Sequence, residues 1–376
     1  MLLICIPQIT PRIRYTMQLF FGELIKTEFE ITQDTAKFQS FSGAKFHYAK
    51  QRIADEVFIY SENLLFEEGI RRQKISVDEY RGMKAFFAHR EPSDLPFDLF
   101  AVAFYFVSRY EEYLPFTADQ YGRFPDEENL LVKEKVHEIP LVNYYAIWLK
   151  ELLQQKFPPL QFQTSPYQFQ LTYDIDFAFA YRGKGMLRNA AGYAKSFLKM
   201  DWNETARRTN VLFGNEKDPF DTFDFQFSLH EKFNLQPVYF FLLGDFGKFD
   251  RNISWKNHHL QSLIKRISEK NEVGIHSSFA SYDRPEKIKT ETARLEKISG
   301  KKNFSNRQHF LKLKFPKTYQ TLLINGINED YTLGFASQVG FRAGIASPFY
   351  WYDLSREEIT KLRIYPFAVM DATLYY

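Results

Sequence analysis

The chain has 376 residues, with 49 Lys and Arg against 46 Asp and Glu and a formal net charge of +3 at pH 7. This length is enough for two ordinary domains, and the charges form no long basic run, which argues against a nucleic-acid-binding stripe and a polybasic membrane patch. The single cysteine, Cys5, excludes an internal disulfide framework and indicates a reducing, cytoplasmic compartment.

The first 165 residues predict a small α/β domain whose role the sequence leaves open. The opening MLLICIP indicates a strand at residues 2–7, because it has no basic flank and its apolar run ends at Pro7, unlike a signal peptide. A further strand is predicted in EVFIYS, and helices in RYTMQLFFGELIK, LFAVAFYFVSRYEEYL and NYYAIWLKELLQQKF. No window approaches the roughly 18 to 20 apolar residues of a membrane span. The prolines of FPPLQFQTSP exclude a helix or a central strand and place the domain boundary near residue 165.

Residues 166–376 have a different sequence pattern, in which short apolar strands alternate with amphipathic helices. Strands are predicted in FQLTYDID, PVYFFLLGD, EVGIHSS, NRQHFLKL and LRIYPFAVM. Helices are predicted in FDTFDFQFSL, HHLQSLIKRISEKN, RPEKIKTETARLEKISG and KTYQTLLING. This alternation is typical of βα units around a parallel sheet or barrel.

Polar side chains gather at the predicted ends of these strands: Asp174 and Asp176, then His276, then Arg307 and His309, with Asp330 in a nearby turn. The C-terminal ends of parallel strands face a common cleft, so we expect these side chains to meet. Asp174 and Asp176 share one strand face, where two carboxylates repel unless one is protonated or a cation lies between them. A divalent metal bound by carboxylate and imidazole would remove the repulsion and leave the other carboxylate as a general base.

Each of these residues also has a purely structural interpretation. An Asp-x-Asp at a strand end is often an Asx turn or a helix cap, and either histidine taken alone is more often a core residue. Arg307 fits a helix cap or a surface ion pair equally well. Their convergence on successive strand ends favours a shared site, because structural polar residues have no reason to select that edge.

The order of the motifs resembles the polysaccharide deacetylase (NodB-homology) superfamily. The motifs are TYDID, an apolar strand, GIH, RQHFLKLKFP and GINEDYTLGF, and they cover residues 168–376. ITPRIRY, SRYEEYLP, YGRF and GFRAG further resemble a two-domain bacterial branch whose N-terminal domain has no assigned role. The resemblance implies a distorted (β/α) barrel at residues 166–376, a divalent ion such as zinc, and hydrolysis of an N-acetyl or related acyl group on a carbohydrate.

The resemblance also implies a set of residues around the metal. Asp174 matches the catalytic base, Asp176 the metal-binding carboxylate and His276 the first histidine of the family's histidine motif. The position of the second motif histidine is occupied by Ala280. His309 is the expected substitute, because it follows Arg307 by two residues and would share its strand face.

Further residues are assigned to catalysis and substrate binding. Arg307 matches the arginine that keeps the base charged, and Asp330 falls where the family often orients neighbouring groups. Arg342 is a second candidate for either pairing with the base or binding an anionic substrate. Tyr350 and Trp351, in SPFYWYDL, are candidates for stacking on a sugar ring, although core packing is the more common use of such aromatics.

The sequence departs from the family once more near its end. No histidine follows His309, although the family uses a late histidine as the general acid that protonates the leaving amine. We therefore expect barrel residues beyond Tyr376, since a barrel that ended there would expose a sheet edge. The leading hypothesis is a metal-dependent carbohydrate deacetylase. The alternative is a non-catalytic carbohydrate-binding or scaffold protein on a degenerate deacetylase barrel, and hydrolysis of another C–N bond also stays open.

Overall fold

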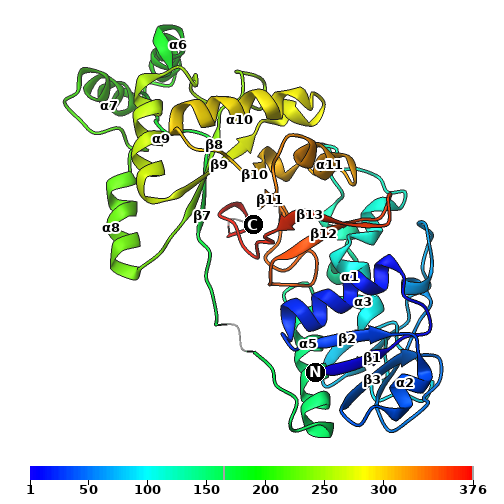
Figure 1. Cartoon of the computed structure of the whole chain (residues 1–376). Helices are drawn as coiled ribbons and strands as arrows, with labels where there is room; N and C mark the ends of the chain where they lie inside the picture. Colours follow the sequence, from blue (N-terminus) through cyan, green and yellow to red (C-terminus); the bar gives the residue numbers. More distant parts are fainter. Residues whose placement is uncertain (164–165, 375–376) are drawn as a thin grey trace. The chain divides into compact units, whose positions relative to one another are not determined.

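The computed structural model describes residues 1–163 and 166–374 and divides the chain into two compact units (Figure 1). Unit 1 consists of Met1–Tyr167, Leu313–Leu323 and Glu329–Tyr376, and unit 2 of Gln168–Lys312 and Ile324–Asn328. Both units mix helices with parallel strands, which agrees with the predicted α/β class. The chain thus returns to unit 1 after leaving it, whereas the sequence analysis assigned everything after residue 165 to one domain.

Unit 1 is built on a four-stranded parallel sheet with the order β2-β1-β3-β4. The strands are β1 (Leu2–Cys5), β2 (Phe29–Thr32), β3 (Ala44–Ala49) and β4 (Val57–Tyr60). All four residues of β1 are buried, as expected of a central strand that is covered on both faces and reads as an unbroken apolar run. β1 and β4 match predicted strands, while β2 and β3 were not predicted.

Three helices of unit 1 follow the predicted apolar patterns: α1 (Pro11–Met17), which continues as a π-helix (Gln18–Leu24), α3 (Leu99–Val107) and α5 (Leu141–Lys156). Two shorter helices, α2 (Thr35–Ser40) and α4 (Leu130–Lys133), were not predicted. Every residue of α3 is buried, and Asp98 caps its N-terminus by accepting hydrogen bonds from the backbone N–H groups of Phe100 and Ala101. The fully apolar composition of α3 therefore reflects a helix enclosed by the core rather than one at the surface.

The remaining strands of unit 1 are antiparallel or mixed. β5 (Val77–Tyr80) and β6 (Met83–Phe86) form a hairpin, and β13 (Glu358–Ile364) pairs antiparallel with β12 (Phe349–Asp353) and parallel with β11 (Glu329–Asp330). The predicted helix in KTYQTLLING is α11 (Lys317–Ile324). The predicted last strand is β13, but the hairpin partner β12 was not predicted.

Unit 2 contains four parallel strands in the order β10-β9-β8-β7. They are β7 (Thr172–Ile175), β8 (Val238–Leu242), β9 (Glu272–Ser277) and β10 (Ser305–Gln308). The helices are α6 (Gly185–Leu198), α7 (Trp202–Phe213), α8 (Phe223–Phe233), α9 (His258–Lys270) and α10 (Glu286–Ser299). α9 and α10 pack against β9, and each of the predicted strands and helices before residue 312 has a counterpart, although several are shorter than predicted.

The predicted (β/α) barrel is not confirmed. Among the described residues no sheet closes on itself, and β7 has a strand neighbour only on the side of β8. The physical reason lies late in the chain, where the antiparallel pairing of β12 and β13 ends the alternation of parallel strands and helices that closure requires. Within the described part of the chain, no helix combines the length and apolar character that crossing a membrane requires.

Candidate metal centre

The predicted site residues of unit 2 are brought to one edge by the register of parallel strands. β7 ends at Ile175, so Asp174 belongs to the strand and Asp176 is the first residue after it. His276 lies near the end of β9, directly opposite Arg307 of β10. Since all four strands run the same way, these side chains emerge at the same edge, as the sequence predicts.

His309 reaches this edge in a way that strand alternation does not describe. β10 ends at Gln308, and His309 begins a short 3-10 segment, whereas the sequence analysis predicted a strand through residue 313. Phe310 and Leu311 have positive φ angles of 61° and 51°, a conformation that turns the chain sharply. The prediction that His309 joins the site agrees with the structure, but the reason given for it, a shared strand face with Arg307, is wrong.

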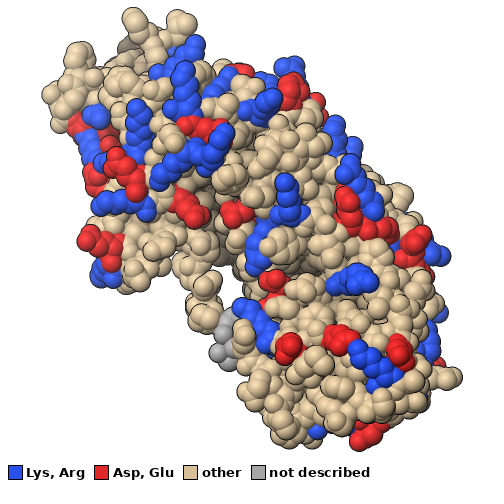
Figure 2. All heavy atoms as spheres, viewed as in Figure 1, with Lys and Arg blue, Asp and Glu red and all other residues tan. Residues whose placement is uncertain are grey.

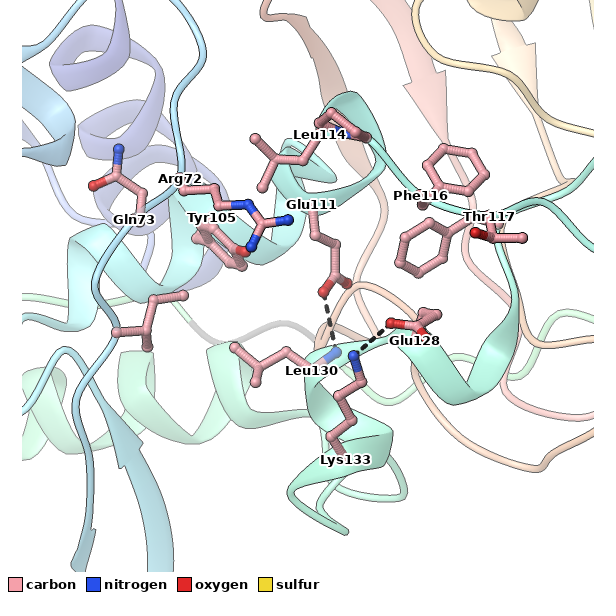
Figure 3. Close-up of a pocket in the computed structure, with 13 residues that line it drawn as sticks. Arg72, Gln73, Tyr105, Glu111, Leu114, Phe116, Thr117, Glu128, Leu130 and Lys133 are labelled. Atoms are coloured by element: carbon pink, nitrogen blue, oxygen red, sulfur yellow. Dashed lines mark hydrogen bonds and ion pairs between the residues drawn. The ribbon is translucent and has the colours of Figure 1, made fainter.

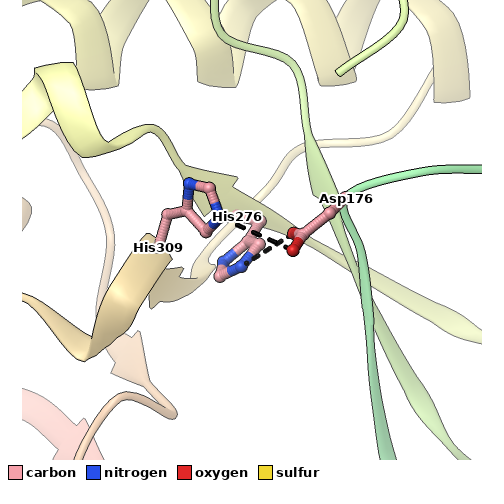
Figure 4. Close-up of side chains that lie close together, drawn as sticks. All are labelled: Asp176, His276 and His309. Carbon is pink, nitrogen blue, oxygen red and sulfur yellow. Dashed lines mark ion pairs between the residues drawn. The ribbon is translucent and has the colours of Figure 1, made fainter. Parts of the chain in front are cut away.

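Asp176, His276 and His309 form a compact triangle (Figure 4). One potential ligand atom from each residue lies within 4.8 Å of those of the other two. Nε2 of His276 is 3.3 Å from Oδ1 of Asp176, and Nε2 of His309 is 3.5 Å from Oδ2 of the same carboxylate. Both histidines are buried, and Asp176 is partly exposed.

The hydrogen bonds of the two imidazoles fix which nitrogen faces the triangle. Nδ1 of His276 lies 2.8 Å from the backbone oxygen of Arg307, and Nδ1 of His309 lies 2.9 Å from Oδ1 of Asp250. Both oxygens only accept, so each Nδ1 carries a proton. In the neutral imidazole the lone pair is then on Nε2, which points at Asp176 in both cases.

When both imidazoles are neutral, the lone pairs of the two Nε2 atoms and of the Asp176 carboxylate point at one another, with no proton or cation between them. Oδ1 of Asp176 is buried and accepts no hydrogen bond from any described residue. Two imidazoles and one carboxylate make a three-ligand set that is typical of a divalent metal with an open coordination position. The residues present thus fit a divalent ion of the zinc type.

The electrostatics of the metal-free triangle are consistent with a cation-binding site. Burial alone would raise the pKa of Asp176, but His276 and His309 hold that pKa well below its ordinary value. Burial likewise opposes the charged form of His309, yet the carboxylates of Asp176 and Asp250 raise its pKa to about 9. The triangle is therefore a place where positive charge is strongly favoured, whether it is carried by protons or by a metal.

Asp174 stands beside the triangle with a different partner. Nη1 of Arg307 donates a hydrogen bond of 2.9 Å to Oδ1 of Asp174, and its other oxygen, Oδ2, is 3.9 Å from Nε2 of His276. The guanidinium also lies over the ring of Phe240, 4.9 Å from its centroid, which holds the arginine in place. The two aspartates of the Asp-x-Asp motif thus have separate roles: Asp176 faces the histidines, and Asp174 faces the arginine.

Asp250 is a functional candidate that the sequence analysis missed. It follows β8 in the loop that leads to α9, and its side chain is nearly inaccessible. Besides His309, it accepts hydrogen bonds from the backbone N–H groups of Phe279 and Ala280, at 2.7 and 3.1 Å. The strand-end rule that identified Asp174 and Asp176 does not reach it, because β8 ends at Leu242 and Asp250 lies well inside the following loop.

A cavity of about 370 Å³ adjoins the triangle within unit 2. Asp176 and His309 line one part of it, and the rest is formed by Phe177, Leu242, Lys248, Phe249, Arg251 and Phe310. Aromatic rings together with cationic side chains suit a ligand that has both an apolar face and polar or anionic groups. Two of the three potential metal ligands, Asp176 and His309, therefore border a space large enough for a small organic molecule.

The other predicted site residues lie in unit 1. The carboxylate of Asp330 is buried and accepts hydrogen bonds from the backbone N–H and the hydroxyl of Thr332. Arg342 is buried and forms a two-point ion pair with Glu112, at 3.1 and 2.8 Å. Its guanidinium is thus already paired, which contradicts the expectation that it binds an anionic substrate.

The aromatic pair predicted for sugar stacking also differs from expectation. Trp351 is 1% exposed and packs edge-on against Tyr319, with ring centroids 5.3 Å apart. Neither face of its indole is available, so the structure places Trp351 in the core of unit 1. Tyr350 is 38% exposed, and its ring lies 5.0 Å from the guanidinium of Arg363. Whether it contacts a sugar stays a prediction.

A second cavity, of about 750 Å³, lies in unit 1 away from any predicted site residue (Figure 3). Glu111 projects toward it and accepts a hydrogen bond from the backbone N–H of Leu130, and Lys133 pairs with Glu128 at 2.6 Å. Arg72, Tyr105 and Phe116 are also among the residues that line it. Lys133 and Glu128 pair with each other and Glu111 pairs with Arg109, so the cavity by itself indicates no particular ligand.

Comparisons with known proteins give a family for the N-terminal region and weak structural similarity elsewhere. Residues 2–158 match the model of a family of unknown function (DUF7033), in line with the expected N-terminal domain without an assigned role. A putative polysaccharide deacetylase from Mycobacterium smegmatis is 13% identical with a TM-score of 0.29, covering 50% of this chain and 58% of that one. IcaB from Ammonifex degensii is 15% identical with a TM-score of 0.23, covering 30% and 54%. No curated protein matches the chain, and TM-scores this low support no inference about its fold or activity.

Proposed function

We propose that unit 2 is a metal-dependent hydrolase that removes an N-acetyl or related acyl group from an amino sugar. The observation that carries the proposal is the convergence of three lone-pair donors, Asp176, His276 and His309, within 4.8 Å of one another. Asp174 lies beside them and is hydrogen-bonded to an arginine rather than to the histidines. This is the arrangement that metal-assisted hydrolysis needs: a ligand set with an open side and a separate carboxylate base.

Each residue of the site has a definite task in this reaction. Asp174 accepts the proton of the attacking water on a carboxylate oxygen, and Nη1 of Arg307, 2.9 Å from its Oδ1, holds that carboxylate in place. His276 and His309 would hold a divalent ion through Nε2, because their Nδ1–H groups donate to a backbone carbonyl and to Asp250. A divalent ion held by the triangle would polarise the acyl carbonyl and make a water molecule acidic near neutral pH.

The carbohydrate part of the proposal rests on the order of sequence motifs and on the adjoining cavity. The motifs from TYDID to GINEDYTLGF resemble the polysaccharide deacetylases. Three phenylalanines of the cavity, Phe177, Phe249 and Phe310, offer aromatic surface next to the metal ligands. Aromatic faces of this kind pack against the C–H face of a sugar ring and orient its substituents toward a reactive centre.

The test combines metal analysis with an activity assay on the full chain. Protein loaded with Zn²⁺, Co²⁺ or Ni²⁺ is expected to hold about one ion per chain and to release acetate from acetylated glucosamine oligomers. Asp174→Asn should keep the metal and lose about 10²- to 10⁴-fold in rate, while His276→Ala should lose the metal itself. Asp245→Asn is the matched control, because Asp245 is an exposed carboxylate of the same unit, paired with Lys287 and Arg294.

Two results would contradict the proposal. If the wild-type chain binds no divalent ion, the triangle is not a metal site, and the alternative of a non-catalytic carbohydrate-binding protein gains support. In the second case the metal binds but the protein hydrolyses no acylated sugar. If Asp174→Asn also leaves any other hydrolytic activity of the protein unchanged, Asp174 is not a catalytic base. Binding of unmodified sugar oligomers by calorimetry then separates a binding protein from a hydrolase with another substrate.

A further inference from the structure

Helix α6 exposes its apolar face. Leucine and alanine residues recur at i, i+3, i+4, i+7 and i+11, which is the spacing of one helix face. The face consists of Leu187, Ala190, Ala191, Ala194 and Leu198, and every one of them is exposed. Met186 and Phe197 border the same face and are 90% and 65% exposed. A pattern that normally faces a protein core therefore faces solvent here.

The opposite face of α6 is polar and makes the contacts with the rest of unit 2. Arg188 donates hydrogen bonds to the backbone oxygen of Asn252, and the hydroxyl of Tyr193 bonds with that of Thr209 on α7. Ser196 is buried on this side. The helix is thus attached to its own unit through polar groups, and its apolar face has been left without a covering element among the described residues.

Helix α9 of the same unit provides an internal comparison. It carries an equally regular apolar face and buries all four of its residues, Leu260, Leu263, Ile264 and Ile267. Both helices are amphipathic, yet they are oriented oppositely. The exposure of the α6 face is therefore a property of this element and not a general looseness of unit 2.

The exposed apolar surface continues past the end of α6 into α7. Met200, in the link between the two helices, is 77% exposed, and Trp202, the first residue of α7, packs edge-on against Phe197 with ring centroids 5.6 Å apart. Phe213, at the other end of α7, is also largely exposed. The apolar face of α6 is here called the α6 face. Exposed aromatic rings of α6 and α7 border it.

The charges beside the α6 face are mainly positive. Residues 182–200 contain Arg182, Lys184, Arg188, Lys195 and Lys199 but no aspartate or glutamate. The exposed Asp201 follows directly and caps α7 by accepting a hydrogen bond from the backbone N–H of Glu204. Lys195 and Lys199 are exposed on the flank of the face, and in the described part of the chain neither lies within ion-pair distance of a carboxylate. Figure 2 shows blue side chains close to the tan tip at the α6 and α7 end of unit 2. These cationic residues are separated from one another in the sequence, so they form no basic run there. The helix brings them close together.

We propose that the α6 face docks onto an anionic lipid surface. Exposed leucine, methionine and phenylalanine would enter the boundary between headgroups and acyl chains, while the flanking lysines contact lipid phosphates. Trp202 stands where interfacial tryptophans are favoured. A second copy of the chain is a poorer occupant, because a symmetric contact through this face would bring the same lysines together. This inference goes beyond the proposed hydrolase activity and does not depend on it.

The experiment is co-sedimentation of the full chain with lipid vesicles. Wild-type protein is expected to bind phosphatidylserine–phosphatidylcholine vesicles, and to bind pure phosphatidylcholine vesicles much more weakly. Leu187→Ser with Leu198→Ser should weaken binding by at least about tenfold, because two exposed leucines no longer enter the interface. Lys195→Gln with Lys199→Gln should weaken binding about fivefold per lysine and reduce its salt dependence.

Controls separate docking from misfolding and from other partners. Ile324→Ser removes an equally exposed apolar residue at the end of α11 and should bind vesicles like the wild type. None of these residues is packed, so thermal unfolding of all variants should be unchanged. The inference is overturned if wild type does not bind anionic vesicles, if the double leucine variant binds as well as wild type, or if the lysine pair has no effect. If the wild type does not bind vesicles but forms a concentration-dependent dimer, and the double leucine variant stays monomeric, the α6 face is instead a contact with a second copy of the chain.

Discussion

Replacement of Asp250 by asparagine tests whether a residue that hydrogen-bonds to a metal ligand, His309, affects metal affinity. The carboxylate binds Nδ1–H of His309 and the backbone N–H groups of Phe279 and Ala280, and it is only 4% exposed. An asparagine has one accepting oxygen in place of two. Whichever way the amide turns, either His309 loses its acceptor or a backbone N–H faces the amide N–H₂. The negative charge that makes the imidazole a better ligand is lost in both cases.

The expected loss of metal affinity follows from other metal sites. Removing a residue that hydrogen-bonds to a metal-ligating histidine weakens metal binding about 10- to 100-fold, or roughly 1.4 to 2.8 kcal/mol. The assay is a competition titration of Zn²⁺ against a chelator, with Asp245→Asn as the control for loss of an exposed carboxylate. His309→Ala defines the effect of removing the ligand itself. If Asp250→Asn binds zinc as tightly as wild type while His309→Ala does not, the orientation of His309 does not depend on Asp250 and the reasoning is refuted.

Three further substitutions test the base, a buried acid and a buried ion pair. Arg307→Met should lower the rate of acyl hydrolysis at least about tenfold with unchanged metal content, measured on the zinc-loaded chain. Burial raises the pKa of Asp98 to about 6, so the folded state binds its proton more tightly than the unfolded state does. The stability contributed by this proton is present below about pH 4 and is lost by about pH 6, amounting to about 3 kcal/mol. Urea titrations across that range should therefore decline more steeply for wild type than for Asp98→Asn. Arg342→Met removes one of the two buried arginines paired with Glu112, and because Arg109 remains 2.8 Å from it, the free energy of unfolding should fall by about 1.5 to 3 kcal/mol.

The strand-end rule explains why much of the metal centre could be predicted. The positions of Asp174, Asp176 and His276 follow from parallel strands alone, because any side chain at those ends must face the same edge. His309 required more than periodicity, since its placement depends on a turn with positive φ angles at residues that are not glycine. Asp250 lies well beyond the end of its strand, in a loop whose course the sequence does not specify.

Unit 1 was predicted less well because its signals are weaker. β2 (FEIT) and β3 (AKFHYA) include charged or polar residues, whereas the predicted β1 and β4 are almost entirely apolar, so the apolar patterns of β2 and β3 do not stand out from the neighbouring loops. Arg342 illustrates a second difficulty. A cationic side chain in a glycine-rich segment predicts a ligand site and a buried ion pair equally well, and only the packing of Glu112 against it distinguishes the two.

Hydrophobic periodicity indicates that a helix has an apolar face but does not say what covers it. The patterns of α6 and α9 are alike, yet one face is exposed and the other is packed on the sheet. The difference lies in the opposite faces. On α6, Asn189 and Tyr193 form hydrogen bonds within unit 2 and Ser196 is buried, whereas the outer face of α9 is charged and remains in solvent. A helix whose polar face is occupied by its own protein and whose apolar face is free has the orientation of an element that completes its burial outside the chain. The lysines on its flank then restrict what can complete it, because burial against a neutral or cationic surface would leave their charge uncompensated.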